Sequence, residues 1–150
     1  MNKSTISLSF PDVNVWMALV LEHHVHRSNA RAWWKTCTGP IAFTRLTEIG
    51  LLRLLTTSAA MDSKPLSMDE AWRAHDKLFQ DERVAFYPEP GGVETHFREY
   101  ASGRVSSPKL WADAWLLAVA RSAEGTLITF DRALAARGAH CLLAAPGEAV

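Results

Sequence analysis

The stretch that decides the fold is residues 5–16, which read TISLSFPDVNVW. Up to residue 10, apolar side chains alternate with serine or threonine, and this alternation is typical of a β-strand. Pro11 and Asp12 end the predicted strand, and residues 13–21 are helical in character. The sequence therefore places Asp12 at the carboxyl end of a strand and directly before a helix.

The rest of the chain continues this alternation of strands and helices. Thr44 can cap a helix through residue 55, and Ser67 with Glu70 forms a capping box before a helix to about residue 80. Further strands are predicted at residues 40–43, 83–87, 126–130 and 140–144, and further helices at residues 25–38, 94–102, 108–122 and 132–137. Strands separated by helices, without tight hairpins, predict an α/β fold with a mainly parallel sheet of about five strands and helices on both faces.

The chain has the size and composition of one globular domain. Of its 150 residues, 48% are apolar and 21% are charged, and its 16 basic and 16 acidic residues cancel. These values exclude the disordered, collagen-like, coiled-coil and disulfide-scaffold classes. The N-terminus does not resemble a signal peptide, and no run reaches the roughly 18 apolar residues of a membrane span. We expect Cys37 and Cys141 to be reduced thiols in a soluble, cytoplasmic protein.

Two carboxylates reach the same edge of the predicted sheet. Asp12 follows the first strand, and Asp131 directly follows the strand at residues 126–130. In open parallel sheets, ligands bind in the crevice beyond the carboxyl ends of the strands. Both acids are therefore candidates for a binding or catalytic site.

Two more acids lie on apolar helix faces. On a helical wheel, Glu48 and Asp113 each fall among leucines. A buried carboxylate without a partner is costly, so each should be paired, protonated or bound to a metal. Local ion pairs with Arg45 for Glu48 and with Lys109 for Asp113 are one interpretation. The four acids together favour the other, an oxygen-only site for a hard cation, Mg²⁺ or Mn²⁺.

Four blocks of sequence that carry these acids resemble a known family. In chain order they are SLSFPDVNVW (residues 7–16), TRLTEIGLLRL (44–54), LWADAWLLA (110–118) and LITFDR (127–132). They resemble a PIN domain and, more narrowly, the VapC-type toxins of bacterial toxin–antitoxin pairs. The resemblance covers almost the whole chain. It implies a single PIN domain over residues 1–150, folded as a three-layer sandwich.

The resemblance also implies an activity and its partners. It indicates a Mg²⁺- or Mn²⁺-dependent endoribonuclease that hydrolyses RNA phosphodiester bonds. Such a protein is the toxin of a type II toxin–antitoxin system. It is held inactive by a cognate VapB-type antitoxin and is usually a homodimer.

The family's metal-binding and catalytic acids carry over to all four acids of this chain. They match Asp12, Glu48, Asp113 and Asp131. We expect Asp12 and Asp113 to be the main metal ligands, with the other two completing the site directly or through water. Among supporting residues, Asn14 matches the small polar residue that assists the first acid, and Thr129 the hydroxyl residue shortly before the last.

Several alternatives remain open on the sequence alone. A metal-binding regulatory module of the receiver type also has acids at strand ends, but it requires adjacent acids after the first strand and a lysine directly after a late strand. The chain has neither. Two others keep the PIN fold: an RNA-binding module without cleavage, and a nuclease acting on DNA. Metal-dependent loss of intact RNA separates an enzyme from a binding protein.

Two other sets of residues are ambiguous. His23, His24 and His26 lack the further ligands of a zinc site, so we expect a solvated turn or a contact with RNA. Eight basic residues could hold an RNA backbone near the acids, although for any single one solvation is the simpler interpretation. They are Arg27, Arg31, Arg45, Arg53, Arg104, Lys109, Arg121 and Arg132.

Overall fold

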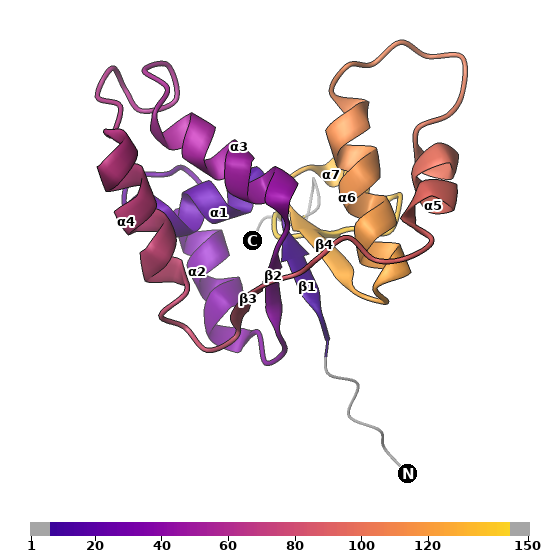
Figure 1. Cartoon of the computed structure of the whole chain (residues 1–150), viewed down its shortest axis with the longest axis horizontal. Coiled ribbons are helices and arrows are strands. Elements are labelled where there is room, and N and C mark those ends of the chain that lie inside the picture. The colour runs from indigo at the N-terminus through magenta and orange to yellow at the C-terminus, as the bar shows by residue number, and fades with distance from the viewer. Residues whose placement is uncertain (1–6, 145–150) are drawn as a thin grey trace.

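The computed structural model describes residues 7–144, whose helices and strands are drawn in Figure 1. The strands are β1 (Ser9–Pro11), β2 (Ile41–Phe43), β3 (Val84–Phe86), β4 (Thr126–Thr129) and β5 (His140–Cys141). The helices are α1 (Val13–Val20), α2 (Arg27–Thr36), α3 (Arg45–Leu55), α4 (Met68–Leu78), α5 (Val93–Tyr100), α6 (Leu110–Ser122) and α7 (Arg132–Ala135). Within this part of the chain, no helix is long and apolar enough to cross a membrane.

The predicted elements are present, most of them with shorter ends. The first strand begins at Ser9 instead of residue 5, and residues 5 and 6 lie outside the described part. The helix expected from residue 108 begins at Leu110, because Lys109 is its N-cap and Pro108 precedes it. The predicted caps of α3 and α4 are confirmed: the hydroxyls of Thr44 and Ser67 accept hydrogen bonds from backbone N–H groups three residues later.

The strands form one parallel sheet in the order β3-β2-β1-β4-β5. Ser9 of β1 pairs with Ile41 on one side and with Thr126 on the other. The chain leaves β1 toward β2 and β3, and later returns to its other side with β4. Such a reversal of strand order opens a crevice at the carboxyl ends of the two strands that flank it. That crevice lies beyond β1 and β4.

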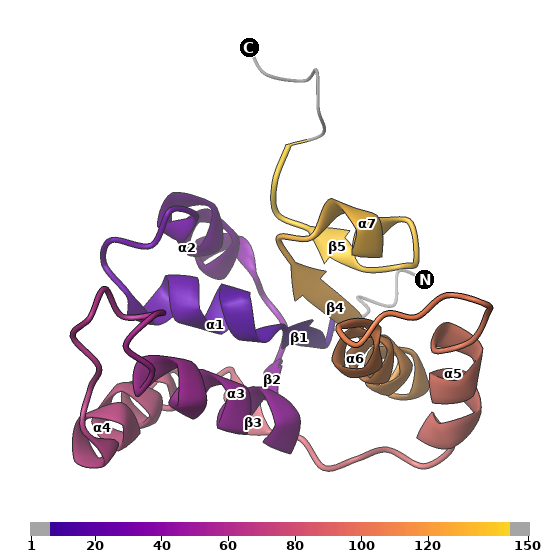
Figure 2. The same ribbon diagram turned by 90° about the horizontal axis from the view of Figure 1, so that it is seen from above.

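Helices cover both faces of the sheet, as the sequence predicts. Along β2, Ile41 and Phe43 join the core beneath α1 to α4, while Ala42 joins the core beneath α5 and α6. Trp16 of α1 is fully buried and stacks on Phe43, with ring centroids 3.8 Å apart. Figure 2 shows the resulting three layers, with α1 to α4 on one side of the strands and α5 to α7 on the other.

Gly125 offers a test of how closely β1 and β4 pack. A Cβ atom at this position would lie 2.7 Å from the carbonyl oxygen of Leu8 and 2.8 Å from the ring of Phe10. This backbone oxygen takes part in the pairing of β1 with β4, so it cannot move aside without disturbing the sheet. We expect Gly125→Ala to lower the free energy of unfolding by about 1–3 kcal/mol in urea titrations. Gly91→Ala is the matched control, because nothing lies within 4 Å of its Cβ and the change should stay within about 0.5 kcal/mol.

Candidate active site

Asp12 is held where β1 ends and α1 begins. Its backbone N–H donates to the carbonyl oxygen of Ile128 at 2.9 Å, which fixes it to the end of β4. As the N-cap of α1, its side chain accepts a hydrogen bond from the N–H of Val15 at 3.0 Å. Its other carboxylate oxygen accepts from the Thr129 hydroxyl at 2.6 Å. The carboxylate is therefore fixed in position at the switch point of the sheet.

Thr129 joins the two acids that follow the strands. While its hydroxyl donates to Asp12, the same oxygen accepts a hydrogen bond from the N–H of Asp131 at 3.0 Å. Asp131 is the N-cap of α7 and accepts from the N–H of Ala133 at 2.9 Å. One buried hydroxyl thus sets the spacing between β1 and β4 at the point where both present a carboxylate.

Asp113 approaches the same point from the first turn of α6. Partial burial raises the pKa of this carboxyl, and the nearby negative charge of Asp131 raises it further, against the opposing effect of Lys109. The pKa of Asp12 is also raised, chiefly by burial, although the bonds from Thr129 and Val15 lower it; the charge of Asp113 adds to the rise. Three carboxylates therefore act on one another electrostatically at one edge of the sheet.

These three acids line one cavity of about 790 Å³. Asn14, Thr129 and Lys109 line it as well, so both predicted supporting residues face the space that the acids surround. Its walls come from the N-terminal end of α1, the loop between α1 and α2, the carboxyl end of β4, the start of α6, and single residues of α3 and α7. In Figure 1, α3 and α6 stand on either side of this edge of the sheet.

Glu48 is buried in α3, but it does not line this cavity. One of its oxygens accepts from Arg45, so the local ion pair that the sequence left open as the alternative is present. Its other oxygen lies 3.0 Å from Nε2 of His75, a buried residue of α4. The helical wheel predicts the burial of Glu48 correctly, but it cannot show that a histidine 27 residues away meets its carboxylate. Glu48 as a metal ligand stays a prediction.

The other local pair that the sequence left open, Asp113 with Lys109, does not form: within residues 7–144 no direct ion pair joins them. Lys109 acts on Asp113 only as a nearby positive charge. This leaves the Asp113 carboxylate free of a bonded cation while a second acid lies close to it. Asp113 is therefore more suited to a ligand-binding role than to a structural one.

The donor set suits a hard cation. In residues 7–144 no group of three or more His, Cys, Asp or Glu side chains forms a ready-made metal shell. However, Asp12, Asp113 and Asp131 supply only oxygen donors, and the pKa values of the first two are raised by burial and by neighbouring negative charge. A bound cation would lower these pKa values again, because its positive charge stabilises the ionised carboxylates. Oxygen-rich sites that also use water ligands are typical of Mg²⁺ and Mn²⁺.

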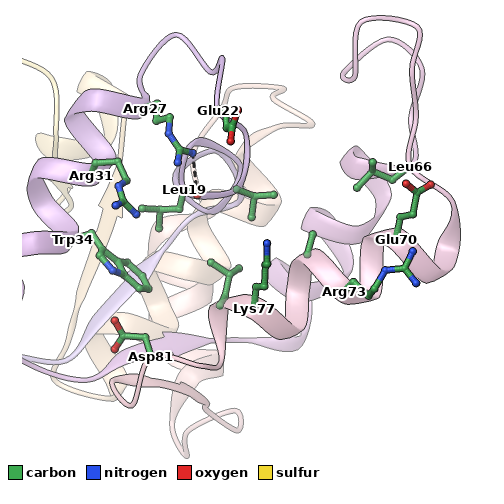
Figure 3. Close-up of a pocket in the computed structure, with 13 residues that line it drawn as sticks. Leu19, Glu22, Arg27, Arg31, Trp34, Leu66, Glu70, Arg73, Lys77 and Asp81 are labelled. Carbon is green, nitrogen blue, oxygen red and sulfur yellow. Dashed lines mark hydrogen bonds between the residues drawn. The ribbon is translucent and has the colours of Figure 1, made fainter.

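A second cavity, of about 740 Å³, lies among α1, α2 and α4. Figure 3 shows the side chains that line it, among them the apolar Leu19 and Trp34 and the charged Arg31 and Lys77. None of the four predicted acids lines it. The cavity at the carboxyl ends of β1 and β4 is therefore the candidate active site.

A comparison of the sequence with protein-family models shows which family it matches. The model of the PIN domain matches residues 9–139, from the first residue of β1 to the residue before β5. The chain belongs to the PIN-domain family. Family membership excludes the receiver-type module that the sequence alone left open.

Relatives of this chain include VapC-type ribonucleases. Ribonuclease VapC41 of Mycobacterium tuberculosis is 40% identical over 133 residues, which cover 85% of this chain and 91% of the relative. Ribonuclease VapC44 of the same organism is 31% identical over 140 residues, covering 91% and 90% of the two chains. The predicted resemblance to VapC-type PIN domains is confirmed.

Solved structures share the fold at lower identity. VapC20 of Mycobacterium tuberculosis, a toxin that cleaves the sarcin–ricin loop, superposes with a TM-score of 0.62 at 17% identity, over 88% of this chain and 96% of that chain. VapBC2 of Rickettsia felis, bound to a promoter DNA fragment, gives 0.60 at 14% identity, over 87% and 92%. The predicted PIN-like α/β sandwich is confirmed.

Two histidines that line this PIN domain's cavity are absent from the predicted site. His24 and His26 line the cavity beside the acids, and both pack against Phe130. The sequence did contain a signal that this loop could belong to the site. Phe130 directly precedes Asp131, and the histidines lie in the loop after α1. Only the tertiary structure shows that this loop reaches the end of β4.

Most of the eight basic residues lie outside the cavity, and several have structural partners. Lys109 is the one that lines it. The Arg27 guanidinium donates to the carbonyl oxygens of Ala18 and Leu19, the latter drawn in Figure 3. The remaining pairings join Arg45 to Glu48, Arg121 to Glu99, and Arg132 to the carbonyl oxygen of Ala144. Within the described residues, Lys109 is thus the basic side chain best placed to meet a phosphate.

The raised pKa of Asp113 predicts how stability depends on pH. Its folded-state pKa lies above the unfolded value, so ionised Asp113 disfavours the fold at neutral pH, and this cost disappears as pH falls below about 4. With EDTA present, Asp113→Asn should therefore raise the free energy of unfolding near pH 7, with a gain that shrinks toward pH 4. Urea titrations across this range measure it. A gain that stays constant with pH would contradict the proposed cost of ionisation.

Proposed function

We propose that this PIN domain is a metal-dependent endoribonuclease and the toxin of a type II toxin–antitoxin pair. The observation that carries the proposal is the set of three carboxylates, Asp12, Asp113 and Asp131, that line one cavity at the switch point of the sheet. Relatives at 40% and 31% identity are named ribonucleases, which supports RNA as the substrate.

We assign Asp12 and Asp113 as the main metal ligands, with Asp131 completing the site directly or through water. Thr129 keeps the first and last of these acids in register through its two hydrogen bonds. Asn14 lines the cavity one residue beyond the N-terminal start of α1, where it can contact substrate or solvent near Asp12. Lys109 supplies the positive charge that a phosphate entering this acidic cavity requires.

The proposed cofactor is Mg²⁺ or Mn²⁺. When bound, such a cation stabilises the charge that develops on phosphate oxygens and helps to activate the attacking water. The carboxylates orient the water and the phosphate for in-line displacement. The protein's own contribution is this fixed geometry. Glu48 remains a proposed fourth acid of the site, bonded in this structure to Arg45 and His75.

The proposed partners follow from the same assignment. A cognate VapB-type antitoxin would hold the enzyme inactive, as the toxin–antitoxin complex among the structural neighbours suggests. We also propose a homodimer and a cytoplasmic location, the latter in keeping with the free thiols of Cys37 and Cys141. Sedimentation of the purified chain measures the first of these, and cell fractionation the second.

Cleavage of total cellular RNA by antitoxin-free protein tests the function directly. We expect discrete fragments with Mg²⁺ or Mn²⁺ and intact RNA with EDTA. A parallel incubation with single-stranded DNA separates the two substrate classes. Binding without cleavage in every metal would favour the RNA-binding alternative, and cleavage of DNA alone would favour the DNA nuclease. Either result would refute the ribonuclease assignment.

A further inference from the structure

Three aromatic rings form one wall of the acid cavity. The ring centroid of Phe130 lies 4.7 Å from that of His26 and 6.0 Å from that of His24, and the two imidazoles are 6.0 Å apart. All three side chains line the cavity and are only partly buried. They bring the loop between α1 and α2 against the residue that directly follows β4. A cluster of rings thus stands beside the carboxylates.

The ring of His24 is held in place by a hydrogen bond. Nδ1 of His24 accepts a hydrogen bond from the backbone N–H of His26 at 3.0 Å, so the ring carries its proton on Nε2. Partial burial lowers the pKa of His24, and the nearby His26 lowers it further, which favours a neutral ring at pH 7. A neutral imidazole attracts a phosphate weakly, but it offers a flat surface on which a base can stack.

The loop is anchored at the end that leads into α2. Arg27, directly after the loop, donates to two backbone carbonyls near the end of α1. Asn29 of α2 donates to the carbonyl oxygen of Leu142, just after β5. These contacts hold the loop that carries the imidazoles before any ligand arrives, and such preorganisation lowers the cost of binding.

We propose that His24, His26 and Phe130 form a stacking platform for one nucleobase of single-stranded RNA, next to the phosphate that is cleaved. This inference rests on the proposed ribonuclease function and goes beyond it, because it assigns a base-binding subsite. Phe130 is the residue before Asp131 and lines the same cavity as the acids, so a base on the platform would lie beside them. Unpaired bases commonly stack on aromatic side chains, whereas paired bases in a duplex are not accessible in this way.

A binding experiment with EDTA tests the platform without any cleavage. The probe is a short fluorescein-labelled single-stranded RNA that spans a site mapped by the cleavage assay, together with versions that carry one abasic nucleotide at each position in turn. We expect Phe130→Leu to weaken binding of the intact RNA about five-fold or more. At one position next to the cleaved bond, the abasic RNA should bind the wild-type protein and Phe130→Leu equally.

Control variants separate stacking from structural damage. Phe130 also packs against the core, so its replacement removes a structural contact as well as the proposed stacking surface. His26→Leu therefore repeats the comparison at a ring in the loop, away from the sheet. Tyr87→Leu and His140→Leu are the matched controls, since both residues are exposed and neither lines the cavity. They should bind intact and abasic RNA as the wild type does.

The outcomes distinguish this inference from the proposed function. If the wild type cleaves RNA but Phe130→Leu and His26→Leu bind the intact probe normally, the platform is refuted and the nuclease stands. Equal losses on intact and every abasic RNA would likewise refute stacking, because the base would then play no part. If the wild type cleaves no RNA in any metal, the proposed function fails, and the platform, which rests on it, fails with it.

Discussion

Asp12→Asn should reduce metal-dependent RNA cleavage by about 100-fold or more while the fold persists. The loss is expected because the substitution removes a negatively charged oxygen donor from the acid set. The fold should persist because asparagine caps helices as well as aspartate, and its amide oxygen can keep the bond from the Val15 N–H. Rates of fragment formation from a mapped RNA give the size of the loss.

A second measurement ties this loss to the metal. Thermal unfolding with and without Mg²⁺ should show stabilisation of the wild type by the ion and much less stabilisation of Asp12→Asn. Asp62→Asn is the matched control: it removes an exposed carboxylate outside the cavity, at a positive φ of 54° that asparagine tolerates. Cleavage near the wild-type rate in Asp12→Asn would show that this acid is not a metal ligand.

The parts of this site that lie at strand ends could be predicted from the sequence. Asp12 and Asp131 each follow a strand, and parallel strands bring their carboxyl ends to one edge regardless of side-chain detail. The capping residues Thr44 and Ser67 were equally predictable, because an N-cap bond depends on residues three positions apart. Local patterns therefore fix where the chain turns and which edge carries the acids.

The remaining parts depend on contacts between distant segments. His75 is 27 residues from Glu48, and the partner of a buried carboxylate cannot be read from a helical wheel. His24 lies more than 100 residues from Phe130, and only the way α2 packs near β5 brings the loop to the end of β4. Periodicity predicts which face of a helix is buried, but it does not predict which side chain from another element meets it.

The pair of Glu48 and His75 carries the other large expected effect, on stability. Both residues are only 7% exposed, and their side chains meet at 3.0 Å between α3 and α4. His75 also lies against the rings of Phe43 and Phe79, so an apolar replacement has contacts available there. Removing His75 leaves Glu48 with Arg45 alone, and removing Glu48 leaves His75 with Asp76 alone, whereas replacing both members of a buried pair with apolar residues often costs little.

We therefore expect His75→Leu to lower the free energy of unfolding by about 3 kcal/mol, because Glu48 then keeps only the solvent-facing Arg45. The double variant Glu48→Leu with His75→Leu should recover much of this loss. Urea unfolding of the wild type, both single variants and the double variant gives the coupling free energy between Glu48 and His75, which we expect to be about 2–3 kcal/mol.

The exposed pair of Glu94 and Arg98 on α5 provides the comparison for this cycle. Their side chains are 67% and 79% exposed, so the same cycle of leucine substitutions should give a coupling of only about 0.3–0.5 kcal/mol. If the two cycles give equal couplings, the buried pair does not hold α3 against α4. Glu48 would then be free to turn toward the acids, and its prediction as the fourth metal ligand would gain support. A large coupling confined to the buried pair would instead make the contact with His75 the main structural role of Glu48.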